Sequence, residues 1–303
     1  MLALISPSEI DYIIQGVDDN LRADGRGCLD YREVVIETGM ISQANGSARC
    51  RLGEGTDVLV GVKVEIGSIE IDGADEEVAA IKAKRGRVVC NIECSPIASL
   101  QFAGRGADDI NNELTQTVDR VLNGPQGGIN LEKLCILPGE ECWVVYIDAL
   151  VLDYAGSILD TIFMTIRAAL FNTRVPKTTV ENNEVEISGD VEEWERIEGW
   201  EQVPVSITLN KIGSRYVVDA TPLEEFTTEA KLSVTVNKSG KVCGIQKSGG
   251  GSIEHSLLNE MIQTGKSLGQ TLIINLDEIL KKEEDDLDAR NGPLEKLGFF
   301  AAT

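Results

Sequence analysis

The sequence predicts an α+β fold with two pseudo-repeated lobes, each made of a β-sheet followed by a helix. Residues 58–67 carry a β-branched residue at every second position, which is typical of a strand with one buried face. Residues 142–156 form an almost continuous apolar run that leads directly into an apolar helical segment. The order of strands followed by a helix recurs after residue 203, which favours a fold built by duplication.

The composition is that of a globular protein with a strong acidic bias. The chain has 303 residues, of which 42% are apolar, and a formal net charge of −22. A chain of this length can bury a sizeable core. Phosphate backbones repel such a charge, so binding to nucleic acid requires a local basic patch or basic partners. The alternative is that the acidity only confers solubility.

We expect no membrane association. The N-terminus MLALISPSEIDYIIQ has no basic segment before its apolar residues, unlike a signal peptide. No window approaches the roughly 18 uncharged apolar residues that are typical of a transmembrane helix. The chain is therefore expected to stay in the nucleus and cytoplasm.

The sequence predicts neither a metal site nor a cofactor. The seven cysteines are an odd number without the dense spacing of a secreted scaffold, so we expect reduced, mostly buried thiols. Cys90 and Cys94 do not form a CxxC pair, and His255 is the only histidine, which leaves too few ligands for zinc. We expect His255 to be a partly exposed polar residue near the start of the last helix.

Residues 1–28 are predicted to form an N-terminal helical arm. Ser8 can cap a helix whose apolar face carries Ile10, Ile13, Ile14 and Val17. The sequence DGRG then ends the segment with a turn.

The first lobe is predicted over residues 29–176. Two strands, 58–67 and 87–95, precede a helix that is expected to begin with Asp108 or Asp109 as its N-cap. The apolar run that follows is expected to be a central strand covered on both faces. Its end turns straight into a helix, and this is a usual place for an anion site.

The second lobe is predicted over residues 203–285. Residues 177–202 are polar and rich in Glu and Asn, and we expect a connecting segment with one small strand. The lobe itself has several strand-like segments and a long helix from about Ile253. Residues 286–303 continue a charged run and are expected to be a disordered tail.

One acidic stretch of the second lobe could carry chemistry. Residues 217–236 gather Asp219, Glu224, Glu225 and Glu229 between two β-like runs, and Lys231 follows them. Such carboxylates can hold Mg²⁺ or position a nucleophile in metal-assisted phosphoryl transfer. A solvated surface turn explains the same residues equally well, and residue chemistry alone does not decide between the two.

Two arginines of the first lobe are candidates for contacts with RNA. Arg105 lies in a glycine-flanked loop, and Arg120 lies on the helix that follows it. A guanidinium in a flexible loop can contact a passing phosphate. For Arg105, a salt bridge to Asp108 or Asp109 is the alternative.

Five segments of the chain together resemble a known family. They are NLRADGRGCLDYR, GSARCRLGEGTDVLVGVKVEIG, FAGRGADD, CWVVYIDALVLDYAGSILDTIFMTIRAALFNTRVP and VVDATPLEEFTTEAKLSVTV. Their order and approximate spacing are similar to those of ribonuclease PH-like subunits of the RNA exosome. The resemblance extends from about Ile10 to Leu280 and implies a ribonuclease PH-like fold.

The resemblance also implies a function and partners. It implies a core ring subunit that supports 3′-to-5′ RNA processing and degradation. Its partners would be other ribonuclease PH-like exosome subunits in a hetero-oligomeric six-membered ring, cap subunits, associated nucleases and single-stranded RNA. The implied location is the nucleus, the nucleolus and the cytoplasm.

The positions that resemble the family's catalytic residues depart from the active pattern. Active members bind phosphate at a Gly-Gly-Thr-Arg-like turn, where Gly156 and Ser157 could still offer donors but Ile158 replaces the arginine. An apolar side chain cannot replace a bidentate guanidinium. Active members also carry a catalytic aspartate where this chain has Lys231, and an ammonium group would repel Mg²⁺. A further aspartate of the active pattern is absent, with Phe226 near its position.

These departures predict a subunit that is not an enzyme, with a vestigial phosphate site at Gly156 and Ser157. The alternative is an active phosphate-dependent 3′ exoribonuclease that uses Asp219, Glu224 and Glu225 around Mg²⁺. The family's channel-facing arginine occurs in a Val-Asp-Arg context, which Arg120 matches, so the resemblance implies RNA contact there, with Arg105 as the second candidate. A scaffold without RNA contact is a third possibility.

Overall fold

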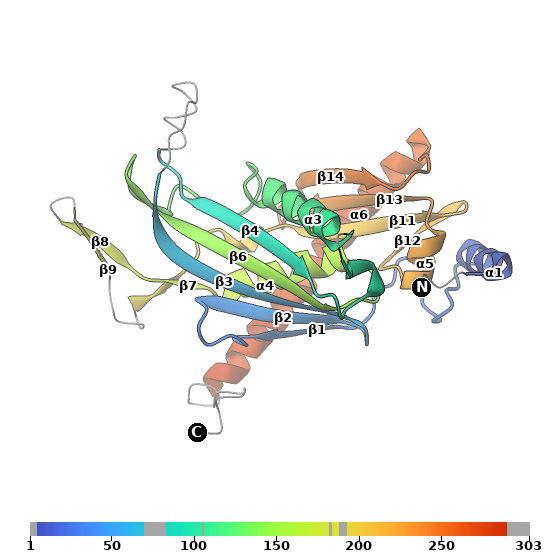
Figure 1. Cartoon of the computed structure of the whole chain (residues 1–303), viewed down its shortest axis with the longest axis horizontal. Coiled ribbons are helices and arrows are strands. Elements are labelled where there is room, and N and C mark those ends of the chain that lie inside the picture. The colour runs from blue at the N-terminus through green and yellow to red at the C-terminus, as the bar shows by residue number, and fades with distance from the viewer. Residues whose placement is uncertain (1–4, 70–82, 105, 182–183, 188–192, 290–303) are drawn as a thin grey trace.

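The computed structural model describes residues 5–69, 83–104, 106–181, 184–187 and 193–289. Its two main sheets have six and four strands, and helices α4 (Ile158–Asn172) and α6 (His255–Ala289) pack on them. In Figure 1 the six-stranded sheet occupies the left and centre of the view and the four-stranded sheet the right, with these helices behind. This is the two-lobed α+β arrangement that the sequence predicts.

The six-stranded sheet comes from the first half of the chain. Its strands are β1 (Val34–Thr38), β2 (Gly46–Leu52), β3 (Thr56–Ser68), β4 (Arg87–Cys94), β5 (Cys135–Leu137) and β6 (Glu141–Asp153). They are ordered β1-β2-β3-β6-β4, and β5 pairs with the start of β6. Only β4 and β6 are parallel, which requires a crossover connection. That crossover contains helix α3 (Gly106–Leu122).

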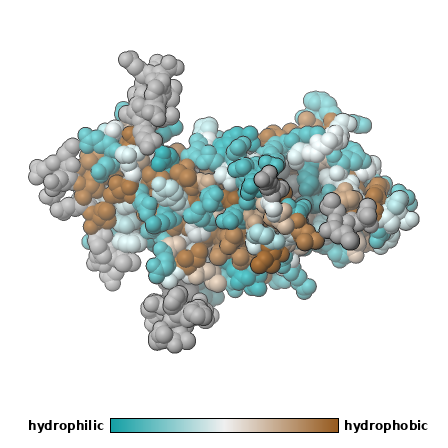
Figure 2. All heavy atoms as spheres, in the orientation of Figure 1, coloured by the Kyte–Doolittle hydropathy of each residue, from teal (hydrophilic) through white to brown (hydrophobic). Residues whose placement is uncertain are grey.

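Strand β3 has the predicted alternation, since Val58, Val60, Val62 and Val64 are all buried. The prediction that β6 is covered on both faces is wrong for most of its length. Asp148 is exposed and its neighbours on the same face are only partly buried. Helices α4 and α6 lie behind the sheet, and the face toward the viewer stays open in the described part of the chain (Figure 1). Figure 2 shows apolar and hydrophilic residues interspersed on this face.

Helix α4 (Ile158–Asn172) lies between the two sheets and is buried on all sides. Every residue from Asp160 to Phe171 is buried, and the helix contacts β2 and β3 as well as β11 (Val205–Ile212) of the second sheet. Its buried Arg167 pairs with Asp277 (2.8 Å) of the last helix. Because α4 touches both sheets, one hydrophobic core extends through both lobes.

The four-stranded sheet is antiparallel and has the order β12 (Arg215–Val218), β11 (Val205–Ile212), β13 (Ala230–Val236), β14 (Val242–Ser248). Helix α5 (Pro222–Thr227) joins β12 to β13, and the long helix α6 (His255–Ala289) packs on β11 and β13. A Cβ on Gly265 would lie 3.1 Å from the side chains of Leu209 and Val234. Glycine therefore permits the close approach of α6 to the sheet.

Helix α6 continues through Ala289. The charged run is helical up to this residue, so residues 286–289 belong to α6 and not to the disordered tail that the sequence predicts over 286–303. The rest of that segment, 290–303, lies outside the described residues.

Helix α3 closes the outer edge of β4. Two of its side chains, and one directly after its end, bond free backbone groups of the strand. Thr115 accepts from the N–H of Ile92 (3.1 Å), Asn111 accepts from that of Cys94 (3.0 Å), and Asn123, the residue after the helix, donates to the carbonyl of Val88 (3.0 Å). These side chains take the place of a neighbouring strand.

The start of α3 differs from the prediction. The helix begins at Gly106, so neither Asp108 nor Asp109 is its N-cap. Both aspartates lie in its first turn, where carboxylates interact favourably with the helix dipole.

The N-terminal helix α1 (Pro7–Asp18) is capped by Ser6, so the prediction of Ser8 is wrong. Proline is favoured at the first helical position, which places the cap one residue before Pro7. The Ser6 hydroxyl and the Glu9 carboxylate form a capping box. The helix buries Ile13 and Val17 in a small second cluster against β11 and β12.

The connection between the sheets contains more structure than one small strand. Strands β8 (Thr178–Glu181) and β9 (Glu184–Ile187) form a hairpin, and β10 (Glu195–Arg196) pairs with β7 (Arg174–Val175). The described residues also include two short 3-10 helices, η1 (Leu100–Phe102) and η3 (Trp200–Gln202). Trp200 packs edge-on against Phe171, with ring centroids 4.9 Å apart.

All seven cysteines are free and five of them are buried, as predicted. His255 is exposed at the first position of α6, where the sequence placed it. Among the described residues, no helix has the length and apolar character required to cross a membrane.

Candidate functional site

A tight turn, residues 155–157, joins β6 to the N-terminus of α4. Gly156 has φ 89° and Ser157 has φ 55°, a left-handed conformation that is strained for serine. A Cβ on Gly156 would lie 2.0 Å from the carbonyl oxygen of Ala220, so only glycine fits this close approach. The structure thus places Gly156 and Ser157 beside the acidic stretch of the second lobe.

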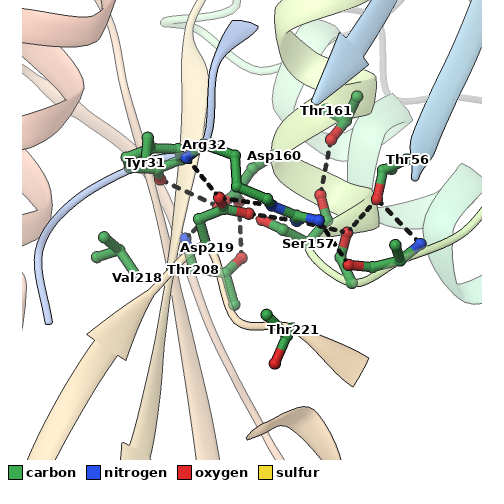
Figure 3. Close-up of polar contacts among 12 residues, drawn as sticks. Tyr31, Arg32, Thr56, Ser157, Asp160, Thr161, Thr208, Val218, Asp219 and Thr221 are labelled. Carbon is green, nitrogen blue, oxygen red and sulfur yellow. Dashed lines mark hydrogen bonds and ion pairs between the residues drawn. The ribbon is translucent and has the colours of Figure 1, made fainter. Parts of the chain in front are cut away.

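The backbone of the 155–157 turn is held by two polar side chains (Figure 3). The hydroxyl of Thr56 donates to the carbonyl of Gly156 (2.8 Å) and accepts from the N–H of Ala155 (3.1 Å). Arg32 Nη1 donates to the carbonyl of Ala155 (2.8 Å). These bonds fix the backbone of the turn.

The amide of Ser157 is bound by Glu225 from α5. The Ser157 N–H donates to Glu225 Oε1 (3.0 Å). The other oxygen, Oε2, accepts the hydroxyl of Tyr154 and lies 3.1 Å from Lys231 Nζ. Burial, and then the Glu225 carboxylate, raises the pKa of Tyr154, so this phenol remains a donor. Ile158, the first residue of α4, packs partly buried against the core.

Asp219 is fully buried and has φ 46°. Its Oδ2 accepts hydrogen bonds from Arg26 Nη1 (2.8 Å) and from the backbone N–H of Arg32 (2.8 Å). Its Oδ1 lies 2.5 Å from Arg32 Nη2. Figure 3 shows the Arg32 side chain extending from Asp219 toward the 155–157 turn. Two guanidinium groups therefore neutralise this carboxylate.

Glu224 is also buried and paired. Arg22 Nε donates to its Oε1 (2.8 Å), and Arg22 Nη2 lies 2.5 Å from its Oε2. The same carboxylate accepts the N–H of Thr221 (2.8 Å), which completes a capping box at the start of α5.

The acidic stretch therefore fits neither of the two interpretations that the sequence allowed, a solvated surface turn or a Mg²⁺ site. Asp219 and Glu224 are buried, so it is not a solvated turn. All three candidate carboxylates bind cations of the same chain, and a Mg²⁺ site needs carboxylate oxygens that are available for coordination. The residues present do not fit the metal. Within the described ranges, no group of three or more His, Cys, Asp or Glu side chains is placed to hold a metal ion.

One more carboxyl group lies beside the turn. Asp160 accepts hydrogen bonds from the backbone N–H and the hydroxyl of Thr208 (2.8 and 2.7 Å) and from the hydroxyls of Ser157 and Tyr31 (both 3.2 Å). Complete burial raises the pKa of Asp160 to about 6 despite these donors. Burial, and then the charge of Asp160, also raises the pKa of Tyr31 well above its ordinary value.

Of the two candidate arginines for RNA contact, Arg120 pairs with a residue of β14 rather than with this network. Arg120 is exposed in the last turn of α3, and its Nη2 donates to Gln246 Oε1 of β14 (3.2 Å). Both residues line a depression of about 280 Å³, which also includes Leu159 in the first turn of α4. Arg105 lies outside the described residues.

Sequence reasoning missed the cations that neutralise the acidic stretch. Arg22, Arg26 and Arg32 all lie in the segment 20–32, and none of the three was a candidate from the sequence. They gather three positive charges in a short segment of a chain with 28 basic and 50 acidic residues. That concentration is the signal that could have identified them.

Comparison with known proteins places the chain in a family. Residues 30–176 match domain 1 of the 3′ exoribonuclease family, and residues 202–267 match its domain 2. Together the two matches cover more than half of the chain.

Individual relatives cover nearly all of it. The exosome complex exonuclease RRP42 of Dictyostelium discoideum is 34% identical over 92% of this chain and 98% of its own length. The exosome complex component Rrp42 of Methanosarcina mazei is 37% identical over 82% of this chain and 86% of its own length. That of Pyrococcus furiosus is 38% identical over 80% and 83%.

Solved structures give the same result. A chain of an archaeal exosome core superposes with a TM-score of 0.72 at 30% identity, covering 89% of this chain and 96% of its own. A chain of the Archaeoglobus fulgidus exosome with RNA bound to the active site has a TM-score of 0.71 at 30% identity, with 88% and 96% covered. Rice Rrp46 is similar at a TM-score of 0.60 and 17% identity over 86% of this chain and all of its own, which shows the shared fold.

Proposed function

The chain belongs to the 3′ exoribonuclease family of ribonuclease PH-like proteins, and we propose that it is a core ring subunit of an RNA exosome that has lost its own catalysis. Its similarity to Rrp42 exosome components over most of its length supports the role in the ring. In that role it supports 3′-to-5′ RNA processing and degradation. Its partners are related ribonuclease PH-like subunits that complete a six-membered ring, cap subunits and associated nucleases.

The loss of catalysis rests on one observation, which is that the candidate metal ligands are already bound to cations of the same chain. Arg26 and Arg32 hold Asp219, and Arg22 holds Glu224. Lys231, at the position of the family's catalytic aspartate, binds Glu225. A lysine there supplies no carboxylate oxygen for Mg²⁺, and its positive charge repels the metal ion. Ile158 supplies no charge for phosphate.

We propose that Arg120, with Arg105, contacts RNA phosphates. Arg120 is exposed, and its hydrogen bond to Gln246 holds it over the depression between α3 and β14. In a chain of net charge −22, a local guanidinium is where a phosphate can approach. Gly156 and Ser157 mark the vestigial phosphate site. The subunit acts where exosomes process RNA, in the nucleus, the nucleolus and the cytoplasm.

Incubation with RNA, Mg²⁺ and phosphate tests the catalytic part of the proposal. The purified chain, alone and assembled with its ring partners, is expected to release no nucleoside diphosphates, with a phosphorolytic family member as the positive control. Phosphate-dependent release that is lost in the Glu224→Gln or Glu225→Gln variant would favour the active exoribonuclease instead.

Native mass spectrometry of the chain purified from cells tests the assembly. We expect a large complex of related subunits. A monomer, or an oligomer of this chain alone, would contradict the ring role.

A further inference from the structure

We propose that Glu225 is an intramolecular occupant of the phosphate position at the 155–157 turn and that its carboxylate keeps inorganic phosphate out. The idea rests on the proposed function in one respect, namely that the turn derives from a phosphate-binding turn. It concerns the binding of phosphate and not turnover of RNA.

Three donors from three elements converge on this carboxylate. The N–H of Ser157 lies at the N-terminus of α4, the Tyr154 hydroxyl follows β6, and the Lys231 ammonium group comes from β13. A helix N-terminal amide, a hydroxyl and an ammonium group are the donors that a phosphate oxygen also accepts from. Glu225 therefore satisfies the groups that an incoming phosphate would need.

Solvent reaches this group of residues. Tyr154, Glu225 and Lys231 all line a cavity of about 790 Å³, with Leu100 and Phe226 among its apolar walls. The side chains of Lys231 and Glu225 are 30% and 14% exposed. Burial of the turn therefore does not explain exclusion of phosphate, because an ion can approach through the cavity.

The other departures from the active pattern do not block the site by themselves. Lys231 carries a positive charge and attracts an anion, and Ile158 removes one ligand without adding a negative charge. Glu225 both occupies the donors and repels a phosphate dianion through its own charge. Removal of that charge with the side-chain shape retained should open the site.

Titration of the full chain with inorganic phosphate tests the proposal. Isothermal titration calorimetry and ³¹P NMR at constant ionic strength remove the contribution of general screening. We expect the association constant for phosphate to rise at least about tenfold in Glu225→Gln, since a repulsive charge a few ångströms away is worth that much or more. The double variant Glu225→Gln/Lys231→Met should lose this gain. Phosphate should raise the Tm of Glu225→Gln more than that of the wild type.

Glu229→Gln is the matched control. It also removes one carboxylate from this segment, but Glu229 pairs with Lys211 rather than with the turn, so phosphate affinity should stay that of the wild type. An equal gain in both variants would reduce the effect to general charge and overturn the proposal.

Two other results would also overturn it. One is a folded Glu225→Gln chain, by circular dichroism, that binds phosphate no better than the wild type. The other is saturable binding of inorganic phosphate by the wild-type chain itself, a result that does not depend on the folding of any variant. None of these outcomes bears on ring assembly or RNA phosphorolysis, which the assays above measure separately.

Discussion

Arg22 and Glu224 are separated by 202 residues in the sequence and form a two-pronged ion pair in the interior, with both side chains almost completely buried. Arg22 also donates to the carbonyls of Val218 and Asp219 (2.9 and 2.8 Å). The pair therefore ties the segment after α1 to the acidic stretch of the second lobe. In this protein the acidic residues of that stretch serve as anchors of the fold.

Replacement of Arg22 by methionine should destabilise the chain by about 3 to 5 kcal/mol, because it leaves the Glu224 carboxylate buried without a cation. Urea unfolding measures the change. The double variant Arg22→Met/Glu224→Gln should recover part of the loss. Arg51→Met, which removes an exposed pair with Glu37, is the control and should cost less than about 1 kcal/mol. Equal costs for the two arginines would contradict the buried-anchor role.

Gly156→Ala should destabilise the fold by more than about 3 kcal/mol, because the new Cβ would meet the carbonyl oxygen of Ala220 in addition to the strain of positive φ. Gly139→Ala is a matched control, since Gly139 has φ 84° and open space around its Cβ position. Its cost should be about 1 to 2 kcal/mol, the penalty of the left-handed backbone alone. Thermal unfolding of both variants checks the difference, and similar Tm values would argue against the close contact.

As the pH rises from about 4 to about 6, the free energy of unfolding of the wild type should fall relative to that of the Asp160→Asn variant. Burial raises the pKa of Asp160 from 3.8 to about 6, so in this window the unfolded chain releases a proton that the folded chain keeps. The total change is roughly 3 kcal/mol. The substitution also alters the bonds to Thr208, which shifts the difference by a constant and leaves its pH dependence. Urea unfolding across this range measures it, and a relative stability that rises with pH would refute the sign.

Arg120→Glu together with Arg105→Glu should weaken RNA binding to the assembled ring while leaving assembly intact. Each lost phosphate contact should lower the slope of log affinity against log salt by about 1. Filter binding and crosslinking at several salt concentrations measure both effects. Arg215→Glu, at an exposed position of β12, controls for net charge. Unchanged crosslinking of RNA to the ring in the double variant would contradict RNA contact by these arginines and would favour a scaffold role.

Local patterns were enough to predict much of the fold. The alternation in β3, the helix after the 155–157 turn and the positions of Gly156 and Ser157 follow from spacing within a few residues. The errors at helix starts are also local. Ser6 and Ser8 flank one proline, and the preference of proline for the first helical position decides between them.

The chemistry of the candidate site could not be predicted in the same way. The sequence shows a row of carboxylates, but whether a carboxylate is available to a ligand depends on which cation the fold brings to it. Asp219 and Glu224 meet arginines almost two hundred residues away. Such pairs depend on the packing of α1, α5 and the second sheet against one another. The open face of β6 has a similar origin, since an apolar strand does not reveal how much of it one chain covers.

The closure of β4 by side chains of α3 matters for a protein that is synthesised before it meets its neighbours. An uncovered strand edge is a template for pairing with other chains and thus a starting point for aggregation. Asn111 and Thr115 of α3, with Asn123 directly after the helix, satisfy part of that edge from within the same chain. The newly made subunit is thereby protected at one border of its largest sheet while it waits for assembly.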